Sequence, residues 1–232
     1  MPIDAAGVVA RLDLVWERIR AAEERFGREP GSVALLAVSK KQETAKIQAA
    51  FAAGQTAFGE SYLREAIDKM DALETLGVRW HFIGRIQGTK TRQIAERFDW
   101  VHSLCDLRHA RRLSQQRPET LPPLAVCIQI NLDAEPGKGG LAPAQVVDFI
   151  AACAELPRLK LVGLMTLPAP VEDEDSQRCP FRELRRLRDR LATPSLPLPE
   201  LSMGMSADLE AAIAEGATMV RVGTAVFGPR EG

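Results

Sequence analysis

The sequence predicts an α/β protein, a single (β/α)8 TIM barrel with an extra helix at its N-terminus. Eight short segments rich in Val, Ile and Leu alternate with seven segments of helical pattern, which is typical of a parallel sheet covered by helices. The chain has 232 residues, which suits one barrel of roughly 250 residues better than two domains. No stretch resembles a domain linker, so we expect one domain over residues 1–232.

The predicted elements follow one another in a regular order. A first helix carries Val8, Leu12, Val15, Ile19 and Ala22 on one face. The strand candidates are Val33–Ser39, Ala57–Glu60, Trp80–Gly84, Trp100–Cys105, Leu124–Leu132, Leu159–Met165, Glu200–Met205 and Met219–Phe227. The helix candidates between them include Thr44–Ala53, Tyr62–Leu73, Thr91–Phe98, Ala144–Glu155 and Phe181–Leu191. An open doubly wound sheet is the alternative, but no Gly-x-Gly-x-x-Gly motif follows the first strand.

Composition narrows the possible classes of function. The net charge is −1, so nothing in the overall charge indicates binding to nucleic acid or to an anionic membrane. Cys105, Cys127, Cys153 and Cys179 are widely spaced, which favours small buried apolar side chains in a reducing compartment. The N-terminus leads directly into a helix, with no signal peptide and no membrane span, so we expect a cytoplasmic protein.

Two consecutive strands end in patterns that suit a phosphate group. The segment 201–206 predicts a buried strand that stops at Ser206, and we expect Ser206 to be the N-cap of a helix over 207–214. Free backbone N–H groups and the helix dipole attract an anion there. The next strand ends in Gly223 and Thr224, where glycine lets backbone amides approach a ligand and the hydroxyl adds a donor. Barrels of this class hold phosphate after strands 7 and 8.

Lys40 stands at the end of the first strand and has two interpretations. Its side chain either extends into solvent as the strand ends, or lies partly desolvated as an amine nucleophile that can form a Schiff base. Position alone leaves these two even. The phosphate pattern favours the nucleophile, because strand 8 neighbours strand 1 in a closed barrel. An amine beside a phosphate site is what pyridoxal phosphate requires.

Arg221 is unusual because it lies inside a strand that is otherwise apolar. Arginine is rarely buried without a partner, so a structural ion pair is one interpretation. The other is a donor to a ring nitrogen or to phosphate oxygens. Together with Lys40, Ser206, Gly223 and Thr224, this donor matches a cofactor with an aldehyde, a ring acceptor and a phosphate.

Six segments in chain order also carry a resemblance to a known family: Leu35–Lys40, Phe58–Tyr62, Trp80–Gly84 with Gln87 and Lys90, Gly163–Met165, Leu201–Ser206 and Arg221–Thr224. From about residue 5 to its end, the chain resembles the pyridoxal phosphate homeostasis protein family (the proline synthase co-transcribed group), which is related to the barrel domain of alanine racemase. The resemblance implies a Schiff-base lysine at Lys40, phosphate ligands at Ser206, Gly223 and Thr224, and a ring-nitrogen partner at Arg221.

Three positions depart from the family pattern. Ser61 stands where the family usually has Asn, so a cofactor contact at Ser61 would have a shorter reach. Arg85 and Thr89 stand where the family usually has Pro and Asn. We include Ser61 among the expected cofactor-binding residues.

The function implied by the resemblance is non-catalytic: binding pyridoxal 5'-phosphate on a barrel lysine for its intracellular homeostasis, with PLP-dependent apoenzymes as possible recipients. A small PLP-dependent amino-acid racemase is the alternative, with weak activity left open. Racemisation needs a second acid or base opposite Lys40, and Tyr62 is the only tyrosine. An aldolase that uses Lys40 on a sugar phosphate is a third class. We expect a monomer, because no apolar stripe is left once the barrel helices have packed.

Other polar residues receive weaker predictions. His81 is expected to be a core histidine rather than a proton-transfer group. His81, His102 and His109 have no spacing typical of metal ligands, so no metal is expected. The arginines between 182 and 190 are expected to form a solvated outer helix face.

Overall fold

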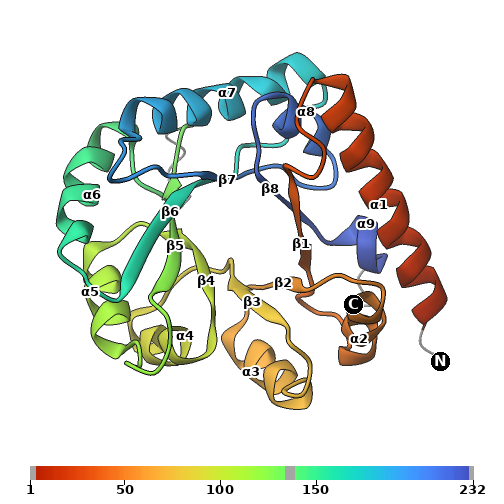
Figure 1. Cartoon of the computed structure of the whole chain (residues 1–232), viewed down its shortest axis with the longest axis horizontal. Helices are drawn as coiled ribbons and strands as arrows, with labels where there is room; N and C mark the ends of the chain where they lie inside the picture. The colour runs from red at the N-terminus through yellow and green to blue at the C-terminus, as the bar shows by residue number, and fades with distance from the viewer. Residues whose placement is uncertain (1–3, 134–138, 230–232) are drawn as a thin grey trace.

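Eight parallel strands close into a barrel in a computed structural model that describes residues 4–133 and 139–229. The strands follow chain order around the barrel, and β1 pairs with both β2 and β8. Figure 1 shows the helices arranged around the outside of this barrel. The predicted (β/α)8 TIM barrel is therefore confirmed.

The strands lie close to their predicted positions. They are β1 Ala34–Val38, β2 Ala57–Glu60, β3 Arg79–Phe82, β4 Trp100–Leu104, β5 Leu124–Ile130, β6 Leu159–Thr166, β7 Glu200–Ser202 and β8 Met219–Val222. Two of the predicted strands extended three or more residues beyond the observed end. The segment after β7 turns at Gly204, and the strand predicted to reach Phe227 stops at Val222 because Gly223 begins a short helix.

The helices cover the barrel, and the extra N-terminal helix is present. They are α1 Ala5–Arg25, α2 Thr44–Ala52, α3 Leu63–Ala72, α4 Thr91–Arg97, α5 Leu107–Gln116, α6 Val146–Ala154, α7 Glu174–Leu191, α8 Leu209–Ala214 and α9 Thr224–Phe227, with 3-10 turns at Gly88–Lys90 and Pro143–Gln145. Helix α7 begins at Glu174, seven residues before its predicted start at Phe181, with Pro180 in its interior. Among the described residues, no helix has the length and apolar character that crossing a bilayer requires.

Two apolar regions hold the molecule together. The larger lies between the outer faces of the strands and the helices, where the predicted face of α1 is buried against α2, α8 and α9. The barrel interior contains smaller clusters, one around Leu36, Ala57 and Met219, and another around Cys127, Val162 and Met165. Because side chains alternate along each strand, Leu36 and Val38 share a face, and Lys40 continues it at the carboxyl end of β1.

Candidate functional site

A cavity of about 290 Å³ lies at the carboxyl ends of the strands and brings the predicted residues together. Its lining contains every residue that the sequence assigned to cofactor binding: Lys40, Ser61, Ser206, Arg221, Gly223 and Thr224. Six further residues complete the walls: Val38, Ile83, Met165, Leu167, Met205 and Ala207. The lining therefore combines an amine, a guanidinium and hydroxyl groups with apolar side chains, which is the usual composition of a small-molecule site.

Lys40 enters this cavity from a tightly held turn after β1. The next residue, Lys41, is exposed and has a φ of 60°, a left-handed backbone conformation that residues other than glycine seldom adopt. The backbone N–H of Lys41 donates to Glu65 Oε1 at 2.5 Å. Lys40 lines the cavity, whereas Lys41 does not line it and is exposed.

A buried polar cluster under the turn was missed by the sequence analysis. Lys69 Nζ donates to the carbonyl of Ser39 at 2.7 Å, and pairs with Glu60 at 2.8 Å and with Glu65 at 2.5 Å. Ser39 Oγ donates to Glu60 Oε1 at 2.6 Å. Burial raises the pKa of Glu60, and Lys69 opposes that rise. The spacing of Glu65 and Lys69, four residues apart on α3, was the only local signal of this cluster.

On the side of the cavity formed by the segment after β7, helix α8 begins later than predicted. The expected N-cap at Ser206 is wrong: the helix begins at Leu209, with Asp208 as its N-cap, after a turn over residues 206–208. Asp208 Oδ1 accepts from the backbone N–H of Met205 at 2.5 Å, so this side chain caps the turn instead of Ser206. Ser206 and Ala207 nevertheless line the cavity.

Glycine is required at two close approaches near the site. Gly204 has a φ of +91°, and a Cβ there would lie 2.5 Å from the Cβ of Ala212. A Cβ on Gly84 would lie 2.2 Å from the backbone oxygen of Ser61. These glycines let the chain segments after β7, β2 and β3 close around the cavity.

Gly223 and Thr224 form the remaining wall beside Lys40. Gly223 is the N-cap of the short helix α9, and Thr224 is its first residue. A barrel of this class commonly places an additional short helix after strand 8, where its first backbone N–H groups face a phosphate. The strand order places this wall next to β1, as expected for a closed barrel.

Arg221 projects into the barrel interior and is only 4% exposed. Its Nη1 donates to Ser202 Oγ at 2.7 Å, and its Nη2 donates to the carbonyl of Thr166 at 2.8 Å. Among the described residues no carboxylate forms an ion pair with it, which argues against a structural ion pair. Burial lowers the pKa of Arg221 to about 10, so the guanidinium remains cationic at neutral pH.

The other predicted residues lie outside this cavity. Tyr62 is 51% exposed and lines an outer pocket with Glu65 and Asp68. His81 is buried in the barrel, where its Nδ1 lies 2.9 Å from Nε2 of His102. Arg85 is exposed at the mouth of a neighbouring cavity.

The described residues contain no cluster of metal ligands, and the four cysteines differ in exposure. Among the described residues, no group of three or more His, Cys, Asp or Glu side chains is arranged to hold a metal ion. The four cysteines are free: Cys127 and Cys153 are buried as expected, Cys105 is half-buried, and Cys179 is exposed. The expectation of burial is therefore wrong for Cys179, because the outer face of α7 carries it.

Comparisons with known proteins show the family to which this chain belongs. Residues 11–231 match the family model of the alanine racemase N-terminal domain. The pyridoxal phosphate homeostasis protein of Pseudomonas aeruginosa is 51% identical over 214 residues, which is 92% of each chain. The Escherichia coli K12 protein of the same name is 47% identical over 227 residues, 97% of each chain. PipY of Synechococcus elongatus, solved with PLP bound, has a TM-score of 0.82 and 35% identity, and the match covers 95% of this chain and 100% of PipY. The chain therefore belongs to the alanine racemase N-terminal domain family and, within it, to the pyridoxal phosphate homeostasis proteins.

Proposed function

We propose that this protein binds pyridoxal 5'-phosphate as a Schiff base on Lys40 and serves as a non-catalytic carrier in PLP homeostasis. The observation that carries the proposal is the single cavity in which Lys40, Arg221 and the ends of β7 and β8 meet. The relatives named for PLP homeostasis, and PipY with PLP bound, support the same function. When bound, the cofactor supplies an aldehyde that condenses with a primary amine.

The residues of the cavity fit the three polar parts of this cofactor. Lys40 supplies the amine. Ser206, Thr224 and the backbone at Gly223 offer hydroxyl and N–H donors to the phosphate. Arg221, held from behind by Ser202 and Thr166, offers a donor to the ring nitrogen.

A racemase is disfavoured by what else the cavity contains. Racemisation needs a proton donor or acceptor on each face of the substrate. Among the residues that line the cavity, only Lys40 and Arg221 are ionisable, and Arg221 stays cationic at neutral pH. Tyr62, on which the racemase alternative depends, lines a different pocket. We infer that the protein holds the cofactor without turning over amino acids.

The deciding experiment compares Lys40→Ala with Lys41→Ala. After incubation with pyridoxal phosphate, native protein and Lys41→Ala should absorb in the visible range, whereas Lys40→Ala should fold and stay colourless, because a side chain at the barrel rim contributes little to the core. Borohydride followed by peptide mass mapping should place the reduced adduct on Lys40. An adduct on another lysine would refute the assignment, and absence of any colour in native protein would instead favour a cofactor-free aldolase.

A chirality assay separates the carrier from the racemase. The loaded protein should leave the optical activity of L-alanine unchanged. Sustained racemisation that Tyr62→Phe abolishes would instead support the racemase.

We further infer that the protein is a monomer in the cytoplasm and passes the cofactor to PLP-dependent apoenzymes. The free cysteines support a reducing compartment.

A further inference from the structure

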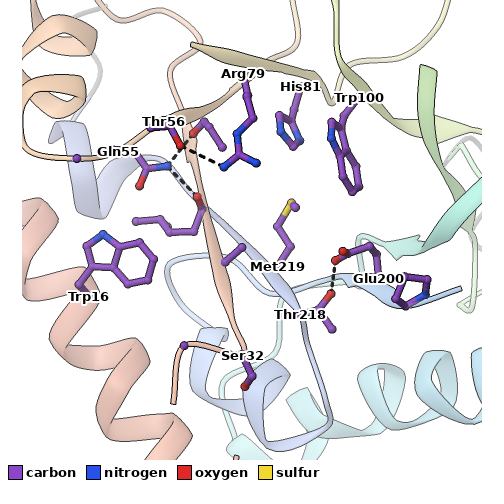
Figure 2. Close-up of a pocket in the computed structure, with 16 residues that line it drawn as sticks. Trp16, Ser32, Gln55, Thr56, Arg79, His81, Trp100, Glu200, Thr218 and Met219 are labelled. Carbon is purple, nitrogen blue, oxygen red and sulfur yellow. Dashed lines mark hydrogen bonds between the residues drawn. The ribbon is translucent and has the colours of Figure 1, made fainter. Parts of the chain in front are cut away.

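A second cavity, of about 580 Å³, lies at the amino ends of the strands, opposite the proposed cofactor site. No residue lines both cavities. Figure 2 shows the His81 imidazole between Arg79 and Trp100, with Glu200 and Thr218 on another part of the wall. The ring of His81 stacks on Trp100, with centroids 5.1 Å apart and an interplanar angle of 12°.

A chain of buried hydrogen bonds links the two cavities through the barrel interior. Arg221 lines the proposed cofactor site and donates to Ser202 Oγ at 2.7 Å. Ser202 Oγ lies 2.8 Å from Nδ1 of His102, and Nε2 of His102 lies 2.9 Å from Nδ1 of His81. His81 lines the second cavity, at the amino ends of the strands, which we call the lower cavity. The series of hydrogen bonds therefore begins at one cavity and ends at the other.

The direction of these hydrogen bonds is assigned from the Arg221 end. Arginine can only donate, so Ser202 Oγ accepts from Arg221. We assign the hydroxyl proton of Ser202 to His102 Nδ1, because this nitrogen is the acceptor within hydrogen-bond distance. Burial keeps both imidazoles neutral, because it lowers the pKa of His81 to about 3 and that of His102 well below its usual range. His102 therefore carries its proton on Nε2 and donates it to His81 Nδ1. The proton of His81 is then on Nε2.

That last donor has no partner. His81 is only 2% exposed, and its Nε2 is buried and forms no hydrogen bond with any described residue. Buried N–H groups in native proteins are nearly always paired, so an acceptor from outside the chain is expected. Met219, whose unbranched side chain can adopt several rotamers, lines the same cavity as His81.

The lining also limits the chemistry of the ligand. Trp16 and Trp100 offer flat aromatic surfaces. Arg79 and Glu200 balance each other in charge, which disfavours a strongly charged ligand. Glu200 Oε2 accepts from Thr218 at 2.7 Å, whereas Oε1 accepts from no described residue. A ligand that donates to Glu200 and accepts from His81 therefore satisfies both groups.

We propose that this lower cavity is a second small-molecule site for a neutral, flat heteroaromatic ligand of the carboxamide type. Its acceptor takes the proton of His81 Nε2, its donor bonds Glu200, and its ring lies on a tryptophan. A ligand bound at His81 changes the hydrogen bonding of Arg221 through His102 and Ser202. This coupling, unlike the site itself, rests on the proposed cofactor function.

Binding is tested by NMR titration of the full chain with nicotinamide. The indole N–H signals of Trp16 and Trp100 and the Nε2 signal of His81 should shift and saturate. Trp80, which packs on Phe58 outside this cavity, should not respond. His81→Phe keeps the stacked ring but loses the donor, and should bind about tenfold more weakly. Glu200→Gln, at the half-buried wall, should also weaken binding, whereas His109→Phe should not.

Cyclohexanecarboxamide carries the same amide on a puckered ring and should bind more weakly than nicotinamide. Equal binding of the two compounds, no saturable shift, or native affinity in both His81→Phe and Glu200→Gln would overturn the site.

Coupling is tested on protein loaded with pyridoxal phosphate. Nicotinamide should change the absorption band of the bound cofactor in native protein. Ser202→Ala should still bind nicotinamide by NMR but lose this response. Binding without any response in native protein would overturn the coupling and leave the site intact. If the protein takes up no pyridoxal phosphate, the proposed function fails, and the NMR titration still decides the site.

Discussion

In the proposed function, Arg221 both holds the cofactor and limits its chemistry. A guanidinium donates hydrogen bonds but cannot accept one, so it favours an unprotonated pyridine nitrogen. An unprotonated ring withdraws electrons less well, and carbanion chemistry needs that withdrawal. The same contact therefore suits a carrier that should not catalyse side reactions.

We predict that Arg221→Glu shifts the ring nitrogen of bound, labelled cofactor toward the protonated form, because a carboxylate accepts a proton where the guanidinium donated one. Nitrogen NMR measures this directly, with Arg92→Glu on the exposed face of α4 as the control. A protonated ring in the native protein would contradict the role given to Arg221.

Ser206 and Thr224 should contribute to phosphate affinity. Ser206→Ala and Thr224→Val should each weaken binding of pyridoxal phosphate by about 1–3 kcal/mol and barely change binding of pyridoxal, because only the ester presents phosphate oxygens. Equilibrium titration with both compounds gives the two affinities. Ser61→Ala should leave their ratio unchanged, and equal affinity of native protein for both compounds would contradict a phosphate site here.

At the scale of elements, ion pairs between segments distant in the chain fix how helices join the barrel. The arginine-rich face of α7 was expected to be solvated, and this is wrong in part. Arg178, Arg182 and Arg185 bind Glu215, which is 1% exposed at the end of α8, at 2.8, 3.0 and 3.3 Å. Burial opposes ionisation, but Arg182 and Arg178 hold the pKa of Glu215 below its usual value.

The Lys69 cluster holds α3 against the turn that carries Lys40. We predict that Lys69→Met lowers the free energy of unfolding by about 3 kcal/mol, because it leaves Glu60 buried without its cation. The double variant Lys69→Met with Glu60→Gln should recover part of the loss, since neither charge remains. Urea unfolding measures both, and a single variant as stable as native protein would contradict the cluster's role.

At the scale of the whole molecule, two neutral histidines in the barrel make stability depend on pH. Burial lowers the pKa of His81 to about 3, whereas an unfolded histidine has a pKa near 6.5. Between these values the unfolded chain binds more protons than the folded one, so stability falls as the pH falls through this range.

For His81 alone the loss should reach about 2 kcal/mol between pH 8 and pH 5. Urea unfolding at pH 8, 6.5 and 5 measures the slope, which should be smaller in His81→Phe. A slope of opposite sign, or one that His81→Phe leaves unchanged, would contradict a neutral buried pair.

The sequence by itself determined the barrel and which of its residues line the cavity proposed for the cofactor. Strand and helix periodicity is local, so the alternating segments and the chemistry at strand ends could be predicted, and Lys40, Ser61, Ser206, Arg221, Gly223 and Thr224 do line one cavity. How each of them contacts a cofactor stays a prediction.

The tertiary structure alone decided the contacts between distant segments. Lys69 reaches Ser39 across 30 residues, and His102 contacts Ser202 across 100 residues. No local pattern encodes such pairs, because these side chains become neighbours only when the strands close into the barrel. The same closure joins the Arg221 guanidinium, the Ser202 hydroxyl and the imidazoles of His102 and His81 in one series of hydrogen bonds between the two cavities.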